Sequence, residues 1–555
     1  MAAAFPEFVD PNPSVDNGFG TQVVPLSTGN VVVTSPFDDA GGVDAGAVYL
    51  FNGATGELIS TLTGSQGDDR VGEMRSSESS ITALTNGNFL ISSPSWDNGG
   101  AVNTGAVTFG NGVTGVSGQV SELNSLIGAA EFEGLGGFFD VAMAGVYPLP
   151  SGDYVVINGR TANGDILNAG SVTHGDGEIG TTGVIDASNS LVGTRRDDRV
   201  GDGGISVLPN GNYIILSERW NSDSETFVGA MTTANGDSGV VGELSETNSL
   251  IGDRQSVFLA ASVVPLTNGS WAVAQPFWRN DAGDLVGAVT RYDGTDAVVG
   301  VFDPENSLVG ASDGDEIGRR GTVTALSNGN YVVASRLWDN GSVVNAGAVT
   351  WRSGTDLTGE VVSEANSFVG TETDQVVSSV WALPNGNYVI TGNGPDASED
   401  VDTVATTFAN GLTGLTGTVD PSRSLIFSHP SNLPDGFAQI LALPNGNYVV
   451  LNFADPNEPG LGVAALTLAD GSSGISGAVT VSNSLVGGSL DRFPPPIVLS
   501  NSNYVIGYAN NTSLFGSGTV PPTGSFSYDD TIPSGDVYDL PSGNFADPAG
   551  IYVRL

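Results

Sequence analysis

The stretch VWALPNGNYVITGN, residues 380–393, decides the fold predicted for this chain. Its Asn385-Gly386 dipeptide favours a tight hairpin, because both turn positions take positive φ. Similar phrases recur along the chain, and their shared leucine is found at Leu26, Leu84, Leu149, Leu208, Leu266, Leu326, Leu383, Leu443 and Leu499. The gaps of 56 to 65 residues suit a four-stranded blade and are too long for one coil of a β-helix.

Turn residues predict four strands in each repeat, as residues 79–128 illustrate. The expected strands a, b and c are Ser80 to Thr85, Asn88 to Ser93 and Thr104 to Phe109, and strand d is about Gly118 to Leu123. The repeat closes with the phrase NSLIG, residues 124–128, which recurs in later repeats. A phrase present in most repeats is interpreted as packing against the neighbouring blade.

These repeats predict one all-β domain over residues 1–555, a closed β-propeller of four-stranded blades. Nine blades are expected, with eight and ten as alternatives because the stretch after Tyr508 is irregular. Residues 5–15 are expected to supply a strand that completes the last blade. Strand a of the blades is expected near 21–26, 79–84, 144–149, 203–208, 261–266, 321–326, 378–383, 438–443 and 494–499.

The excess of acidic residues argues against ligands that are bound through clusters of basic side chains. The 555 residues contain 61 acidic and 17 basic residues, for a net charge of -44, so a nucleic-acid ligand is not expected. No run of about 18 apolar residues predicts a membrane span, and the first ten residues do not resemble a secretory signal. With no cysteine, the fold depends on packing and sheet hydrogen bonds.

The stretch GAVYLFNGATGELISTLTGSQGDDRVG, residues 46–72, resembles the FG-GAP repeats of integrin-α-type propellers. The resemblance implies a propeller fold. In that family some blades bind calcium at the hairpin between strands a and b. Here short Asn-Gly turns occupy that place and supply no carboxylates, so no metal is expected at these hairpins. No cofactor is assigned, and calcium at other acidic loops stays an alternative.

Catalytic constellations are hard to assemble from this sequence. The two histidines, His174 and His429, lack a Gly-x-Ser-x-Gly context and are interpreted as structural or exposed. The acidic pairs Asp68-Asp69 and Asp197-Asp198 are interpreted as turn-forming residues. No catalytic or metal-ligating residue is predicted.

Tryptophan and aspartate instead gather in the longer loops, which connect strands b to c and d to a. An up-and-down blade places both kinds of loop on one side, where aromatic and polar groups suit a sugar or a protein ligand. The alternative is that the tryptophans are packing wedges at the sheet edge. The tentative ligand-binding residues are Trp96, Asp97, Trp220, Trp278, Trp338 and Asp339.

We therefore expect a non-catalytic, secreted or cell-surface module that binds glycan or protein, for example in adhesion. One alternative is a carbohydrate-active hydrolase or lyase that uses loop carboxylates. Another is a structural repeat module of a larger surface protein. The module is expected to be an extracellular monomer that neither binds nucleic acid nor inserts into a membrane.

Overall fold

The computed structural model forms two compact units, one of residues 1–261 with 294–303 and one of residues 262–293 with 304–555. Each unit is described by itself. The structure describes residues 7–553 except 75–78, 138–143, 295–296, 320, 374, 376–378, 395–400, 431–436, 454–463, 488–496, 508–512, 522, 527–537, 540–544 and 547–551.

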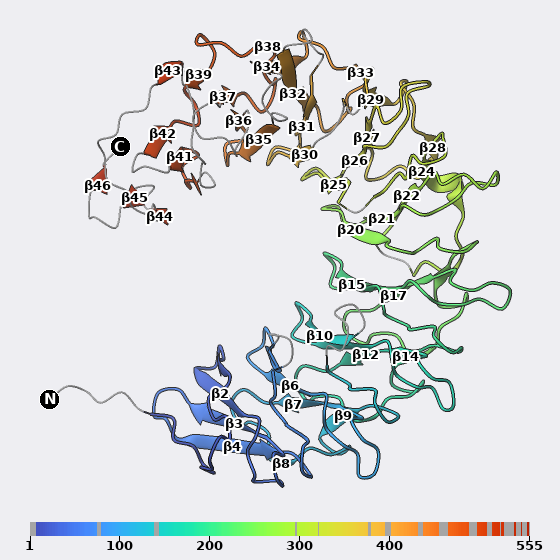
Figure 1. Ribbon diagram of the computed structural model, residues 1–555, viewed down its shortest axis with the longest axis vertical. Helices are drawn as coiled ribbons and strands as arrows, with labels where there is room; N and C mark the ends of the chain where they lie inside the picture. Colours follow the sequence, from blue (N-terminus) through green and yellow to red (C-terminus); the bar gives the residue numbers. More distant parts are fainter. Residues whose placement is uncertain are drawn as a thin grey trace. The chain divides into compact units, whose positions relative to one another are not determined.

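The described residues form an all-β repeat architecture of eight five-stranded and two three-stranded sheets. The first sheet, in blue in Figure 1, has the order β1-β2-β3-β4-β8. Its strands are β1 (Val23–Pro25), β2 (Asn30–Ser35), β3 (Ala47–Asn52), β4 (Leu58–Thr63) and β8 (Gly118–Gln119). The first four are antiparallel neighbours in chain order, the up-and-down arrangement expected for a blade, although Thr28-Gly29 stands here in place of an Asn-Gly turn.

The first compact unit contains three further five-stranded sheets. They are β5 (Ile81–Ala83), β6 (Phe89–Ser93), β7 (Ala106–Gly110), β9 (Ser125–Ile127) and β13 (Gly183–Val184); β10 (Ala144–Pro148), β11 (Tyr154–Asn158), β12 (Ser171–Gly175), β14 (Leu191–Val192) and β18 (Gly242–Glu243); and β15 (Gly204–Val207), β16 (Tyr213–Ser217), β17 (Ala230–Ala234), β19 (Leu250–Ile251) and β23 (Gly300–Val301).

The second compact unit contains four five-stranded sheets and the 3-10 turn η1 (Pro304–Asn306). They are β20 (Ser262–Pro265), β21 (Trp271–Gln275), β22 (Ala288–Tyr292), β24 (Ser307–Val309) and β28 (Glu360–Val361); β25 (Val323–Ala325), β26 (Tyr331–Ser335), β27 (Ala348–Arg352), β29 (Ser367–Val369) and β33 (Gly417–Thr418); β30 (Ser379–Ala382), β31 (Tyr388–Asn393), β32 (Val401–Ala409), β34 (Ser424–Pro430) and β38 (Gly477–Ala478); and β35 (Phe437–Ala442), β36 (Tyr448–Phe453), β37 (Ala464–Ala469), β39 (Leu485–Gly487) and β43 (Gly524–Phe526).

Two three-stranded sheets follow in the second unit. They are β40 (Ile497–Val498), β41 (Tyr504–Gly507) and β42 (Ser513–Gly516), and then β44 (Tyr538–Asp539), β45 (Phe545–Ala546) and β46 (Tyr552–Val553).

The outermost strand of each five-stranded sheet comes from the next repeat. Gly118–Gln119 pairs in parallel with β4, with Leu62 opposite Gly118 and Thr63 opposite Gln119. The expectation that strand d runs from Gly118 to Leu123 is therefore wrong. The fourth strand of the second sheet, β5-β6-β7-β9-β13, is instead Ser125–Ile127, within the recurring NSLIG phrase, and it pairs with β7. Each repeat is thus tied to the one before it by backbone hydrogen bonds.

The NSLIG phrase holds this arrangement through its side chains. Asn124 Oδ1 accepts the N–H of Ser121, and its Nδ2 donates to the carbonyl of Gln119, both at 2.9 Å. The hydroxyl groups of Ser125 and Thr108 lie 2.6 Å apart and are buried. The phrase therefore fixes the bend between the outer strand of one sheet and the fourth strand of the next.

The core consists of apolar layers between consecutive sheets. In the first layer, Leu50 and Leu62 of the first repeat pack with Phe89 and Ile91 of the second. Burying each such side chain contributes about 1.5–3 kcal/mol. Because each layer is shared by two repeats, a repeat gains most of its stability from its neighbours.

The Asn-Gly-Asn turns, at the opposite end of the strands from the long loops, join neighbouring repeats by side-chain hydrogen bonds. Asn88 Oδ1 accepts the N–H of Gly112 in its own repeat at 2.9 Å, and its Nδ2 donates to the carbonyl of Gly177 in the next repeat at 2.8 Å. Asn330, Asn387 and Asn447 make the same pair of bonds. The second asparagine recurs because it satisfies two backbone groups at once.

The segment expected to complete the last blade packs on the first sheet. Residues 7–15 contain no strand, and residues 5 and 6 lie outside the described residues. The rings of Phe8 and Phe51 lie 5.1 Å apart, and Asn12 Nδ2 donates to Asp38 Oδ1 at 2.8 Å. Near the other end, β46 pairs with β45.

Candidate functional site

A buried carboxylate joins the two kinds of long loop. Asp198, in the loop between β14 and β15, is fully buried. Its Oδ2 accepts the N–H groups of Thr194 at 2.9 Å and Arg195 at 2.7 Å. Its Oδ1 accepts the backbone N–H of Asn221 at 3.1 Å and the side-chain Nδ2 of Asn221 at 2.8 Å. Because Asn221 belongs to the loop after β16, in the next repeat, Asp198 ties neighbouring repeats together.

The same position is polar in other repeats, and sequence reasoning missed its role. A carboxylate or carboxamide stands five residues after the glycine that ends the NSLVG-type phrase, which is the signal that could have found it. Its oxygens accept backbone N–H groups in every such repeat. The residues are Asp69, Glu133, Asp198, Asp315 and Gln375. The interpretation of Asp69 and Asp198 as simple turn formers therefore understates them.

Burial sets the protonation behaviour of these groups. Desolvation raises the pKa of Asp69, Asp198 and Asp315 above the usual range, and raises the pKa of Glu133 to about 7. The backbone N–H bonds act in the opposite direction, because they stabilise the ionised form. Glu133 uses both oxygens structurally, accepting Ala129 N–H at 2.8 Å and Ala162 N–H at 2.6 Å.

The four tryptophans expected to contact a ligand are buried. The exposed fractions of Trp96, Trp220, Trp278 and Trp338 are 3–5%. Three of them belong to apolar clusters, in which Trp96, Trp220 and Trp338 each pack with residues of two consecutive repeats. This placement favours the packing alternative over ring stacking on a sugar.

The two aspartates assigned to the same site shape their own loops. Asp97 and Asp339 are half-buried. Asp97 Oδ1 accepts the N–H of Asn103 at 2.6 Å, and Asp339 Oδ1 accepts the N–H of Asn345 at 2.8 Å. Each closes the loop between the second and third strands of its sheet. The structure therefore brings the six predicted residues to equivalent loops of separate repeats, and not into one cluster.

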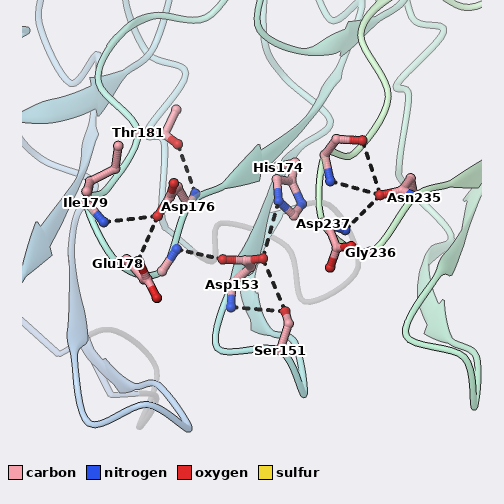
Figure 2. Close-up of polar contacts among 12 residues, drawn as sticks. Ser151, Asp153, His174, Asp176, Glu178, Ile179, Thr181, Asn235, Gly236 and Asp237 are labelled. Carbon is pink, nitrogen blue, oxygen red and sulfur yellow. Dashed lines mark hydrogen bonds and ion pairs between the residues drawn. The ribbon is translucent and has the colours of Figure 1, made fainter.

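His174 lies in a polar contact that differs from a catalytic triad (Figure 2). Its Nε2 is 3.8 Å from Asp153 Oδ2, which also accepts the hydroxyl of Ser151 at 3.2 Å. A Ser-His-Asp triad needs the serine hydroxyl on the histidine. Among the contacts of the described residues, Ser151 bonds to the carboxylate instead. Burial lowers the pKa of His174.

His429 lies in β34, where its backbone pairs with Asp402, and its side chain lies outside the described residues.

Cavities lined by described residues include three that open among the loops and the strands beside them. The first, of about 780 Å³, is lined by Trp220 with hydroxyl and carboxylate side chains around it. The second, of about 430 Å³, is lined by Arg319 and Arg336, and the third, of about 400 Å³, by Arg160 and Arg199. The first and third belong to the first compact unit, and the second belongs to the second unit.

The described residues contain no group of three or more His, Asp or Glu side chains placed to hold a metal ion. In the same part of the chain, no helix has the length and apolar character of a membrane span.

Three solved structures have a distant likeness to the chain. The chain is similar to a protein described as the extracellular domain of a hybrid two component system from B. thetaiotaomicron, with 11% identity and a TM-score of 0.21, covering 95% of this chain and 60% of the other. It is also similar to a polysaccharide lyase, with 10% identity, a TM-score of 0.21 and coverage of 82% and 91%. A prolyl oligopeptidase B from Galerina marginata is also similar, with 7% identity and a TM-score of 0.23, covering 78% of this chain and 54% of the other. No curated protein sequence matches the chain.

The comparison with protein families corrects the resemblance to FG-GAP repeats. The stretch at residues 46–72, which carried that resemblance, lies inside a match to another family, so the FG-GAP assignment is wrong. Its Val-Gly ending recurs for a local reason. Val71 is buried and bridges Gly46, where an added Cβ would lie 2.3 Å from the nitrogen of Val71.

The family that matches is DUF5650, a repeat of unknown function. Its eight matches begin close to eight of the nine recurring leucines. They cover residues 25–73, 83–137, 148–202, 207–259, 265–319, 325–379, 382–432 and 442–492. Because these segments amount to well over half of the chain, the protein belongs to the family of DUF5650 repeat proteins.

Proposed function

We propose that this protein is a non-catalytic, extracellular glycan-binding module whose ligand occupies the cavity at Trp220. The observation that carries the proposal is the indole N–H of Trp220. It is buried, and it has no hydrogen-bond partner among the described residues, although its side chain lines a cavity of about 780 Å³. A buried donor without an acceptor costs free energy, which a ligand hydroxyl group would recover.

The other lining groups suit a polyhydroxylated ligand. Ser222, Ser224 and Thr247 can donate and accept hydrogen bonds, and Asp223 and Glu246 can accept them from sugar hydroxyl groups. Such a mixture of a few polar groups beside an aromatic side chain is typical of small-molecule sites. Adhesion through a protein ligand at the same face is the alternative.

Trp220→Phe tests the proposal, because it removes the N–H and keeps an aromatic ring. We expect binding of a neutral oligosaccharide, first identified on a glycan array, to weaken about threefold to tenfold in calorimetry, the loss of one hydrogen bond. The matched control is Trp96→Phe, because Trp96 Nε1 already donates to Ser65 Oγ at 3.0 Å. The proposal fails if no glycan binds, or if Trp220→Phe and wild type bind equally. Turnover of the bound glycan would replace it with the hydrolase or lyase alternative.

The acidic surface supports an extracellular monomer. A net charge of -44 makes copies of the chain repel one another and keeps the protein soluble. This charge also opposes nucleic-acid binding.

We further propose that the sheets continue into one closed propeller of nine blades. The support is that β40 and β41 begin a ninth sheet at the ninth recurring leucine, Leu499. A closed ring would leave no sheet edge unpaired. Class averages of single particles by electron microscopy should then show a ring with nine blades, and an open arc or two separate rings would contradict this proposal.

A further inference from the structure

The cavity at Trp220 has an acidic lining. Among the described residues, five carboxylate side chains line it against one guanidinium group, that of Arg195. The carboxylates belong to Asp223, Glu225, Glu243, Glu246 and Asp253. A neutral ligand gains nothing from this excess of negative charge, whereas a cationic ligand is attracted by it.

Two of the five carboxylates are paired with arginine. Arg195 forms an ion pair with Asp223 through Nη2. Arg254, which is not part of the lining, donates from Nε to Asp253 Oδ2 at 2.7 Å. Both arginines are thus engaged within the protein, and the three glutamates of the lining have no compensating charge among the described residues.

The backbone holds these three glutamates in place. Glu225, Glu243 and Glu246 are exposed, and their side chains make no hydrogen bond or ion pair within the part of the chain that the structure describes. Glu243 ends β18, which pairs with β14. The carbonyl of Glu246 accepts the N–H of Gly300 at 3.0 Å. Only the side chains therefore need to become ordered when a ligand binds.

Two buried atoms at the same cavity lack a partner, one a donor and the other an acceptor. Trp220 is 4% exposed, and its indole N–H has no acceptor among the described residues. Asp253 Oδ1 is buried and has no donor in the same part of the chain. Each unsatisfied atom costs free energy. A ligand that satisfies both needs an oxygen acceptor and an N–H or O–H donor, and an amino sugar carries both.

The carboxylates do not converge on one point. Among the described residues, no three acidic or histidine side chains lie close enough together to hold a metal ion. Carboxylates spread along an opening of about 780 Å³ instead suit a ligand that carries several positive charges along its length.

We propose that the Trp220 cavity binds an oligosaccharide that carries protonated amino groups. Glu243 and Glu246 pair with the ammonium groups, and the indole N–H of Trp220 donates to a sugar oxygen. That the amines are carried by a saccharide rests on the proposed glycan-binding function, which the amino groups narrow to one class of glycan. The hydroxyl groups of Ser222 and Ser224 in the lining favour a saccharide over a basic peptide, because they match sugar hydroxyl groups.

Calorimetry on the full chain can compare fully deacetylated chitosan and cellulose oligomers of equal length, in slightly acidic buffer where the amines are protonated. The two ligands differ by the amino group that replaces one hydroxyl group on each sugar. We expect the chitosan oligomer to bind at least about tenfold more tightly, and added salt to reduce this difference. Equal binding of the two oligomers, or binding of neither, overturns the proposal. Spermine supplies amines without sugar, and equally tight binding of spermine overturns the saccharide part.

Variants at exposed positions locate the amine site. Glu246→Gln should weaken binding of the chitosan oligomer about twofold to fivefold, and adding Glu243→Gln should weaken it further. Neither change should affect binding of the cellulose oligomer. The matched control is Glu178→Gln, because Glu178 is an exposed glutamate of the same compact unit outside this cavity. An unchanged affinity in the double variant, or an equal loss in the control, would show a diffuse effect of net charge and overturn the site.

The same measurements separate this inference from the proposed function. If a neutral glycan binds and responds to Trp220→Phe, but the chitosan oligomer binds no more tightly than the cellulose oligomer, only the amine preference falls. If the chitosan oligomer binds and responds to Glu246→Gln but not to Trp220→Phe, the carboxylate contacts stand and the indole contact that carries the proposed function falls. If no saccharide binds, both fall.

Discussion

Replacing Trp338 with alanine is expected to lower the free energy of unfolding of the second compact unit by about 3–5 kcal/mol. The side chain is 4% exposed and packs with Leu266, Leu308 and Val333, which belong to two consecutive repeats. Its removal leaves a cavity in the layer that joins those repeats. Hydrogen exchange should therefore become faster in both adjoining sheets, β20-β21-β22-β24-β28 and β25-β26-β27-β29-β33.

The control for this prediction is an exposed apolar residue of the same unit. Leu412 is 68% exposed, so Leu412→Ala should change the unfolding free energy by no more than about 0.5 kcal/mol. If Trp338→Ala instead melts like wild type and loses affinity for a ligand, the tryptophan is a contact residue, as one of the two sequence-based hypotheses had it.

The repeat and its hairpins could be predicted from the sequence because their determinants are local. The Asn-Gly dipeptide marks the hairpin correctly, and Gly386 has a φ of +88°. The expectation that both turn positions take positive φ is wrong, because Asn385 does not, and the turn closes with a hydrogen bond from Gly386 N–H to the carbonyl of Leu383. The second asparagine of the phrase also recurs because it bonds two backbone groups. A pattern of this kind can be recognised within one repeat of the sequence, because it does not depend on the neighbouring sheet.

The strand at Gly118–Gln119 was wrongly assigned as the fourth strand of its own repeat because its pairing is not local. Gly118–Gln119 is only two residues long, too short for alternation of polar and apolar residues to show. Its partner Leu62 lies in the preceding repeat. Sequence spacing alone does not say which sheet so short a strand joins, whereas the hydrogen-bond register does.

The burial of the candidate site residues could not be predicted from the sequence, because it also depends on the neighbouring repeat. A phrase such as SRLWDNG, residues 335–341, identifies a loop with an aromatic side chain, but the burial of Trp338 is supplied by the neighbouring repeat. Likewise, Asp197 and Asp198 look equivalent in the sequence. In the structure Asp198 is fully buried, whereas the side chain of Asp197 is 44% exposed.

The difference in burial between Asp197 and Asp198 predicts that substitution of Asp198 strongly lowers stability. Asp198→Asn should lower the unfolding free energy of the first compact unit by about 2–4 kcal/mol, because the amide keeps one acceptor oxygen and turns an NH₂ group toward buried N–H donors. The affected donors are the N–H groups of Thr194 and Arg195 on one side and those of Asn221 on the other. Denaturant unfolding followed by tryptophan fluorescence would measure the change.

Asp197→Asn is the matched control, since it makes the same chemical change one residue away. Asp197 has a φ of +63°, a conformation that asparagine tolerates well, so the backbone should not be strained. We expect a change within about 0.5 kcal/mol. Equal losses in the two variants would show that the carboxylate of Asp198 contributes no more than a surface charge to the joining of the repeats.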